Sequence, residues 1–134
     1  MSFTLAPGIL DEIVGDARRC YPREGCGLIV GRAGMGLRFI AMANTLGSAT
    51  AYEMDPRQLI EALRSIRESG EELAAIYHSH PAGPTAPSRV DIERAYYPDA
   101  VVLIVSLERA ESPAIGAFRI VEGRVRAVEL RAIV

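Results

Sequence analysis

Several features that would indicate other classes of protein are missing from this sequence of 134 residues. It contains no lysine, and its 15 basic residues are arginines spread along the chain. The formal net charge is −2, so nothing indicates binding to nucleic acid or to an anionic membrane surface. No stretch approaches the roughly 20 apolar residues that a transmembrane helix needs. We therefore expect neither a nucleic acid nor a membrane as partner.

A secretory signal is missing as well. Residues 1–7 lack a basic segment followed by a long apolar run. The only cysteines are Cys20 and Cys26, and in a cytoplasmic protein both are expected to be reduced, partly buried thiols. We therefore expect a cytoplasmic protein.

Hydrophobic residues make up 49% of the chain and charged residues 24%, as in ordinary globular proteins. The length predicts a single domain over residues 1–134 with a hydrophobic core. Predicted helices cover residues 7–20, 56–69 and 88–96, and predicted strands cover 25–31, 37–43, 73–78, 100–107, 114–121 and 124–131. The second helix should bury Leu59, Ile60, Leu63 and Ile66. This order of elements predicts an α/β or α+β sandwich.

Both histidines lie in the stretch Tyr77-His78-Ser79-His80-Pro81. Side chains on a strand alternate between its faces, so His78 and His80 should point the same way and Ser79 the opposite way. Zinc binds neutral imidazole nitrogens and carboxylate oxygens, and a catalytic zinc ion leaves a fourth position to water. The pair is therefore suited to hold zinc together with a carboxylate from the next element.

Ser88 and Asp91 follow after a loop rich in proline and glycine. Ser-x-x-Asp before a helix approximates a capping box, in which the serine accepts from helix amides and the aspartate lies near the positive end. The neighbouring histidines instead favour Asp91 as a third zinc ligand. For Ser88, a capping role and a catalytic role are compatible.

These residues resemble the motif of the JAMM (MPN+) metalloprotease family. The motif reads Glu, then His-x-His, seven residues, Ser, two residues and Asp. Here His80 is followed by seven residues, Ser88, two residues and Asp91. Glu24, within residues 22–31, is the candidate for the upstream glutamate. The resemblance spans residues 8–121.

The resemblance implies the MPN fold, a mixed, curved β-sheet flanked by helices and related to the cytidine-deaminase architecture. It implies one Zn²⁺ ion held by His78, His80 and Asp91. Glu24 would take a proton from the metal-bound water and pass it to the leaving amine, and Ser88 would stabilise the oxyanion. Without that context, a glutamate before a glycine-bounded strand is usually a surface residue.

Compact prokaryotic members of this type resemble enzymes that act on small ubiquitin-like sulfur carriers of the ThiS/MoaD kind. The implied function is a zinc metallopeptidase or isopeptidase that hydrolyses an amide after the Gly-Gly-like tail of such a carrier. Residues 44–55 correspond to a segment that helps to hold the substrate tail as an added strand. This segment is short here, which weakens any case for polyubiquitin specificity.

A non-catalytic MPN module that serves as an interaction scaffold is the main alternative. The Pro-Cys-x-x-Cys element of nucleoside deaminases, the His-x-His-x-Asp-His element of metallo-β-lactamases and a His-Glu-x-x-His helix are all absent. The apolar residues 130–134 form an edge to which a second copy could pair, so a homodimer is a further expectation.

Overall fold

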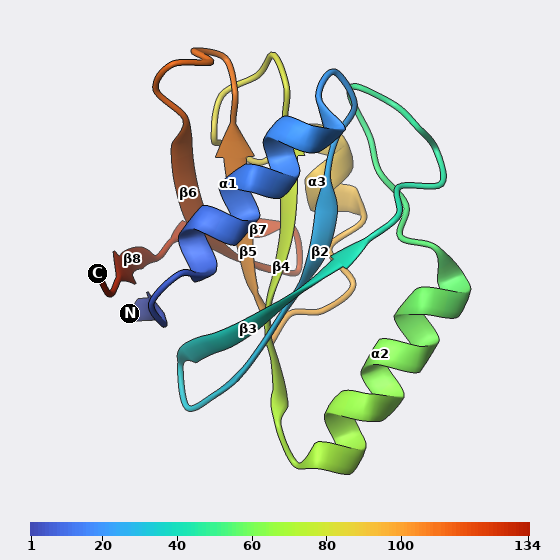
Figure 1. Cartoon of the computed structure of the whole chain (residues 1–134), viewed down its shortest axis with the longest axis vertical. Helices are drawn as coiled ribbons and strands as arrows, with labels where there is room; N and C mark the ends of the chain where they lie inside the picture. The colour runs from blue at the N-terminus through green and yellow to red at the C-terminus, as the bar shows by residue number, and fades with distance from the viewer.

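The computed structural model describes residues 1–134 (Figure 1). Eight strands form one mixed sheet in the order β7-β6-β5-β4-β2-β3-β1-β8, accompanied by three helices. The elements are β1 (Ser2–Leu5), α1 (Ile9–Cys20), β2 (Cys26–Arg32), β3 (Met35–Met42), α2 (Pro56–Ser69), β4 (Glu72–His80), α3 (Arg89–Glu93), β5 (Val101–Ser106), β6 (Ala114–Val121), β7 (Arg124–Ala127) and β8 (Glu129–Ala132). None of the helices is long and apolar enough to cross a membrane.

The sheet is strongly curved, as its connectivity requires. β7 and β8 stand at opposite ends of the strand order, yet only Val128 separates them in the sequence. In a flat sheet, strands in these positions would lie about 34 Å apart, which one residue cannot span. The sheet therefore curls until its two ends approach each other, and Val128 donates a backbone hydrogen bond to Ala117 of β6 (2.8 Å).

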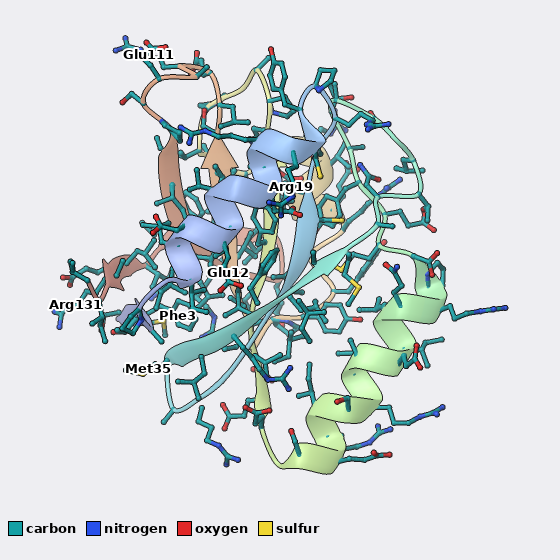
Figure 2. The ribbon with its side chains drawn as sticks, in the orientation of Figure 1. Phe3, Glu12, Arg19, Met35, Glu111 and Arg131 are labelled. Atoms are coloured by element: carbon teal, nitrogen blue, oxygen red, sulfur yellow. The ribbon has the colours of Figure 1, made fainter.

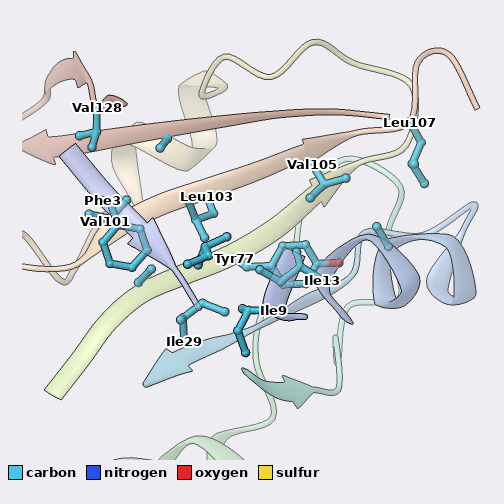
Figure 3. Close-up of a cluster of buried hydrophobic side chains, with 14 residues drawn as sticks. Phe3, Ile9, Ile13, Ile29, Tyr77, Val101, Leu103, Val105, Leu107 and Val128 are labelled. Atoms are coloured by element: carbon cyan, nitrogen blue, oxygen red, sulfur yellow. The ribbon is translucent and has the colours of Figure 1, made fainter. Parts of the chain in front are cut away.

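Each face of the sheet is packed against a helix. On one face, α1 buries Ile9, Ile13 and Ala17, which recur every four residues and so form one stripe of the helix. Figure 3 shows this cluster, with the ring of Tyr77 near Ile13. On the other face, α2 packs its own apolar stripe against β2, β3 and β4. The buried residues of this second cluster are Cys26, Leu28, Val30, Met42, Met54, Ala62 and Ile66. The central strands β2 and β4 are thus supported on both faces.

Capping groups and charged residues stabilise the ends of the two longer helices. Asp55 caps α2 by accepting hydrogen bonds from the backbone N–H groups of Arg57 (2.9 Å) and Gln58 (3.1 Å), and Gly70 ends the helix at a φ of 72°. α1 carries acidic residues in its first turn and basic residues in its last, and Figure 2 labels Glu12 and Arg19 among them. This arrangement suits the helix dipole.

Two predictions about the helices were wrong. The helix predicted over residues 88–96 ends at Glu93, and the N–H of Tyr96 bonds to the carbonyl of Arg94, only two residues back. Ile60 does not belong to the buried face of α2 and is 60% exposed. It follows Leu59 directly, and one residue step turns a helix by about 100°, which carries Ile60 away from the sheet.

The C-terminal strand also differs from its prediction. The single strand expected over residues 124–131 is divided at Val128, because β7 pairs with β6 whereas β8 pairs in parallel with β1. β1 itself was not predicted. One side of residues 129–132 is therefore occupied by the same chain, and homodimerisation through the other side stays a prediction.

Candidate metal centre and active site

β4 delivers both histidines from its last three residues. Ile76 packs on the α2 face of the sheet and Tyr77 on the α1 face, so alternation places His78 and His80 on the α2 face. Ser79 points to the α1 side, as the sequence predicted. Both imidazoles are buried, His78 almost completely. A strand packed on both faces holds these rings rigidly.

The histidines converge with Asp91, which lies in α3. The Nε2 atoms of His78 and His80 are 3.1 Å apart, and Asp91 Oδ2 lies 3.0 Å from the former and 2.9 Å from the latter. Tetrahedral zinc with bonds of about 2.0–2.1 Å would separate its ligand atoms by about 3.3 Å. The three atoms thus form a triangle close to the size that such an ion requires. They are the one group of three or more His, Cys, Asp or Glu side chains in the chain close enough to share a metal ion.

The two imidazoles are oriented in different ways. His80 Nδ1 lies 2.7 Å from the carbonyl oxygen of Pro84, so Nδ1–H donates to this carbonyl. When the ring is neutral, Nε2 then has the lone pair that a metal requires. His78 Nδ1 is buried without a hydrogen-bond partner. Its ring is instead stacked on that of Tyr52, with 4.8 Å between ring centroids and 24° between planes. On its Nδ1 side, His78 is therefore held by packing against Tyr52 and not by a hydrogen bond.

Asp91 and Ser88 form the predicted capping box. Asp91 Oδ2 accepts from the backbone N–H of Ser88 (2.8 Å), and Ser88 Oγ accepts from the backbone N–H of Asp91 (3.1 Å). The box locks the carboxylate against the start of α3 and aims it at the histidines. Because Ser88 Oγ acts here as an acceptor, its hydroxyl proton is left for another acceptor in the site.

Glu24 is not on the surface, contrary to what its local sequence alone would suggest. The register that pairs Cys26 with His78 continues through the hydrogen bond from Ser79 N to the Gly25 carbonyl (3.0 Å), which brings Glu24 opposite His80. Paired residues share a face, so Glu24 points to the side of the histidines. It is only 3% exposed, and its Oε1 has no hydrogen-bond partner.

The backbone of Glu24 is tied to the loop that follows β3. Its N–H donates to the Ser48 carbonyl (2.8 Å), and its carbonyl accepts from Asn44 Nδ2 (3.1 Å). Asn44 also bonds within its own loop, to the Ala51 carbonyl and to the N–H of Glu53. This single asparagine therefore connects Glu24 with the segment that contains Tyr52.

Burial and mutual charge set the protonation of the site. Burial raises the pKa of Glu24 to about 7, with the positive charge of His80 opposing the shift and Asp91 adding to it. Burial lowers the pKa of His78. For His80, burial is outweighed by hydrogen bonds to Asp91 and Pro84, which raise its pKa. For Asp91, burial is outweighed by hydrogen bonds from both histidines, which hold its pKa far below the usual range.

A cavity of about 370 Å³ opens beside the converging side chains of His78, His80 and Asp91. His78 and Asp91 form part of its wall, and Tyr52 belongs to the wall on the loop side. Eleven of its fifteen lining residues are hydrophobic, whereas Glu24 is not among them. The cluster of ligand atoms therefore has an apolar compartment on one side and a carboxyl group opposite His80 on another.

The cysteines take no part in this chemistry. Both are free, in agreement with the prediction of reduced thiols. Cys26 is completely buried, and burial raises the pKa of its thiol to about 12, so Cys26 offers no thiolate at neutral pH. Burial raises the pKa of the Cys20 thiol as well. Tyr52 and Asn44 were not singled out by the sequence analysis. Their only signal was their position in the loop expected to contact the substrate.

The comparison with protein families finds one match. The family of prokaryotic homologues of the JAB domain matches residues 7–121. The CysO-cysteine peptidase of Mycobacterium tuberculosis is 34% identical over 119 residues, which cover 87% of this chain and 82% of that protein. The desampylase of Haloferax volcanii is 33% identical over 112 residues, covering 77% and 79%. A probable TtuB-protein conjugate cleaving protease of Thermus thermophilus is 44% identical over 89 residues, covering 66% and 60%.

Solved structures share the fold. A protein from Desulfitobacterium hafniense superposes with a TM-score of 0.87 at 32% identity, covering 98% of this chain and 92% of that chain. A JAB1/MPN domain protein from Archaeoglobus fulgidus superposes with a TM-score of 0.67 at 18% identity, covering 99% and 98%. The predicted fold, a mixed, curved sheet flanked by helices, is confirmed.

Proposed function

Because the chain belongs to the family of prokaryotic homologues of the JAB domain, we propose that it is a zinc-dependent metallopeptidase. Its substrate would be a small ubiquitin-like sulfur carrier of the ThiS/MoaD kind, cleaved at the amide after its Gly-Gly-like tail. The names of the relatives support this class, since they are peptidases or proteases of CysO-cysteine and of TtuB conjugates, together with desampylases. The observation that carries the proposal is the triangle of ligand atoms beside the buried Glu24.

His78, His80 and Asp91 would hold the zinc ion. The donor set fits, because two imidazoles and one carboxylate are common ligands of catalytic zinc and leave one position open. The geometry fits too, since all three atoms lie within 3.1 Å of one another. When bound, zinc would polarise the scissile carbonyl and acidify a water molecule.

Glu24 would act as general base and then as general acid. Burial raises the pKa of Glu24 in the metal-free protein. A buried carboxyl beside the metal-bound water could accept its proton and return it to the leaving amine. Neither histidine is free for this task if both bind the metal. The lack of a partner for Glu24 Oε1 leaves this oxygen available for water or for the amine.

Ser88 would donate its hydroxyl proton to the developing oxyanion. Its Oγ is held by the N–H of Asp91, which places the donor next to a metal ligand. A preorganised donor of this kind is worth about 3–4 kcal/mol of transition-state stabilisation.

The carrier tail would approach through the apolar cavity. Glu24 must face the leaving amine, but it does not line this cavity. We therefore assign the cavity to the acyl side of the scissile bond, where the carrier tail lies. The loop over residues 44–55 forms part of the wall, and its ends are joined by a bridge between Asn44 and Met54.

The test uses a ThiS/MoaD-type carrier extended beyond its Gly-Gly end by one cysteine, by a short peptide or through a lysine side chain. The zinc-loaded protein should release the free carrier from at least one of these, as read by mass spectrometry, and Glu24→Gln should not. Cleavage of none of the three, or full activity of Glu24→Gln, contradicts the proposal. A metal-free, inactive protein would favour an interaction scaffold.

A further inference from the structure

Ser79 lies between the two histidines but points away from them, and its contacts are with Gly25 on the neighbouring strand. Ser79 Oγ accepts from the backbone N–H of Gly25 at 2.7 Å, and the backbone N–H of Ser79 donates to the Gly25 carbonyl at 3.0 Å. One serine thus binds both polar groups of the residue that follows Glu24. Both bonds are buried, where hydrogen bonds are strong and their loss is costly.

Gly25 has no room to move on its other side. A Cβ atom at this position would lie 2.6 Å from Tyr77 Oη and 2.8 Å from Asp16 Oδ2. These two groups are themselves joined, because the Tyr77 hydroxyl donates to the buried carboxylate of Asp16 in α1 (3.0 Å). A residue with any side chain would collide with this pair, so Gly25 is enclosed between Ser79 and the Tyr77–Asp16 pair.

From these contacts we propose that Ser79 is a positioning residue that sets the place of Glu24 relative to the metal ligands. Ser79 belongs to the same strand as His78 and His80. Its two hydrogen bonds to Gly25 therefore fix the backbone next to Glu24 relative to that strand. The bonds to Asn44 and Ser48 tie the same backbone only to a loop. Tyr77 and Asp16 complete the brace by filling the space behind Gly25. The inference rests on the proposed function for its catalytic consequence, but not for the brace itself.

The decisive variant is Ser79→Ala, which removes the Oγ acceptor and keeps the strand. In the proposed peptidase, kcat should fall about 10- to 100-fold, since small misplacements of a catalytic group cost factors of this size. KM and zinc affinity, measured by competition with a chelator, should stay within about twofold of wild type because no ligand changes. Ser79→Thr, which keeps a hydroxyl, should recover most of kcat.

A second measurement does not depend on activity. Amide hydrogen exchange of Gly25, read by NMR, should be slow in the wild type and at least tenfold faster in Ser79→Ala. Ser106→Ala is the matched control. Ser106 is a buried serine of β5 that pairs with His80 in the sheet, and its Oγ donates to the Gly83 carbonyl instead of contacting Gly25. It should leave the exchange of Gly25 unchanged.

The two measurements separate the two ideas. Slow exchange of Gly25 in Ser79→Ala, or an unchanged kcat despite fast exchange, overturns the positioning role. A wild-type protein that cleaves no carrier conjugate overturns the proposed function, while the exchange of Gly25 still shows whether Ser79 holds the backbone beside Glu24. An equal loss of kcat in Ser79→Ala and Ser106→Ala would point to general destabilisation and would also contradict the inference.

Discussion

Ser88 and Asp91 are joined by two reciprocal hydrogen bonds, of 2.8 Å and 3.1 Å, so one short segment serves both the helix and the candidate metal site. Asp91 Oδ2 meets both histidines and the N–H of Ser88 at once. Capping of α3 therefore fixes the carboxylate of the candidate ligand Asp91, and the capping and catalytic roles proposed for Ser88 are compatible in one geometry.

Ser88→Ala should lower both stability and activity, but by different amounts. Loss of the cap costs about 1 kcal/mol of folding free energy, whereas loss of an oxyanion donor costs about 10²- to 10³-fold in kcat. Urea unfolding and steady-state kinetics on a carrier conjugate measure the two effects. Ser88→Thr keeps the hydroxyl and should keep most of both. A purely capping role for Ser88 predicts an unchanged kcat in Ser88→Ala at temperatures where the variant is folded.

Glu24→Gln should abolish cleavage while making the metal-free protein more stable. The folded-state pKa of about 7 lies above the ordinary value of 4.5, so ionisation costs stability as pH rises between these two values. At about 1.4 kcal/mol per pKa unit, the cost reaches up to about 3 kcal/mol above pH 7, and glutamine does not incur it. Urea unfolding from pH 4 to pH 8 should show that the free energy of unfolding of Glu24→Gln exceeds that of the wild type. The difference should grow up to about pH 7 and then level off. A difference in unfolding free energy that does not change with pH would contradict the raised pKa of this buried carboxyl.

Zinc binding should weaken as pH falls, mainly through His80. Hydrogen bonds to Asp91 and Pro84 raise its pKa, so a proton must leave before Nε2 can bind metal, whereas burial keeps His78 neutral. Below the pKa of His80, affinity should fall by up to about tenfold per pH unit. Calorimetry in buffers of different ionisation enthalpy should detect about one proton released per zinc ion in mildly acidic solution. Binding without proton release there would be inconsistent with these contacts.

Tyr52→Ala should weaken zinc binding although Tyr52 offers no ligand atom. Its ring stacks on His78, whose Nδ1 has no hydrogen bond to orient it. Removal of a group that orients a ligand typically costs about 10- to 100-fold in affinity. Tyr52→Phe keeps the stacked ring and is the control, expected within about threefold of wild type. Equal zinc affinities for the alanine and phenylalanine variants would show that stacking does not hold His78.

Much of the site followed from local rules. Alternation along a strand predicted that His78 and His80 share a face, and helix capping predicted the pairing of Ser88 with Asp91. Both rules act over a few residues, so one sequence contains enough information. The position of Glu24 came from the family resemblance, because it depends on a register between β2 and β4 that no local pattern specifies.

The parts that the sequence did not predict depend on contacts between distant segments. Asp16 and Tyr77 are 61 residues apart, and nothing near Asp16 indicates that a tyrosine hydroxyl will meet it in the interior. β1 and β8 lie at opposite ends of the chain and form strands by pairing with each other. Tyr52 stacks on His78 from a loop in which Asn44 bonds to the residues on either side of Tyr52, Ala51 and Glu53.

The roles proposed for Glu24 and Ser88 both require that His78, His80 and Asp91 together bind one zinc ion. This requirement can be tested by measuring the metal content of the purified protein with inductively coupled plasma mass spectrometry, after loosely bound ions have been removed. We expect about one zinc ion per chain in the wild type and in Glu24→Gln, and almost none in folded Asp91→Ala and His80→Ala. A folded wild-type protein without zinc, or full zinc occupancy in Asp91→Ala, would contradict this expectation.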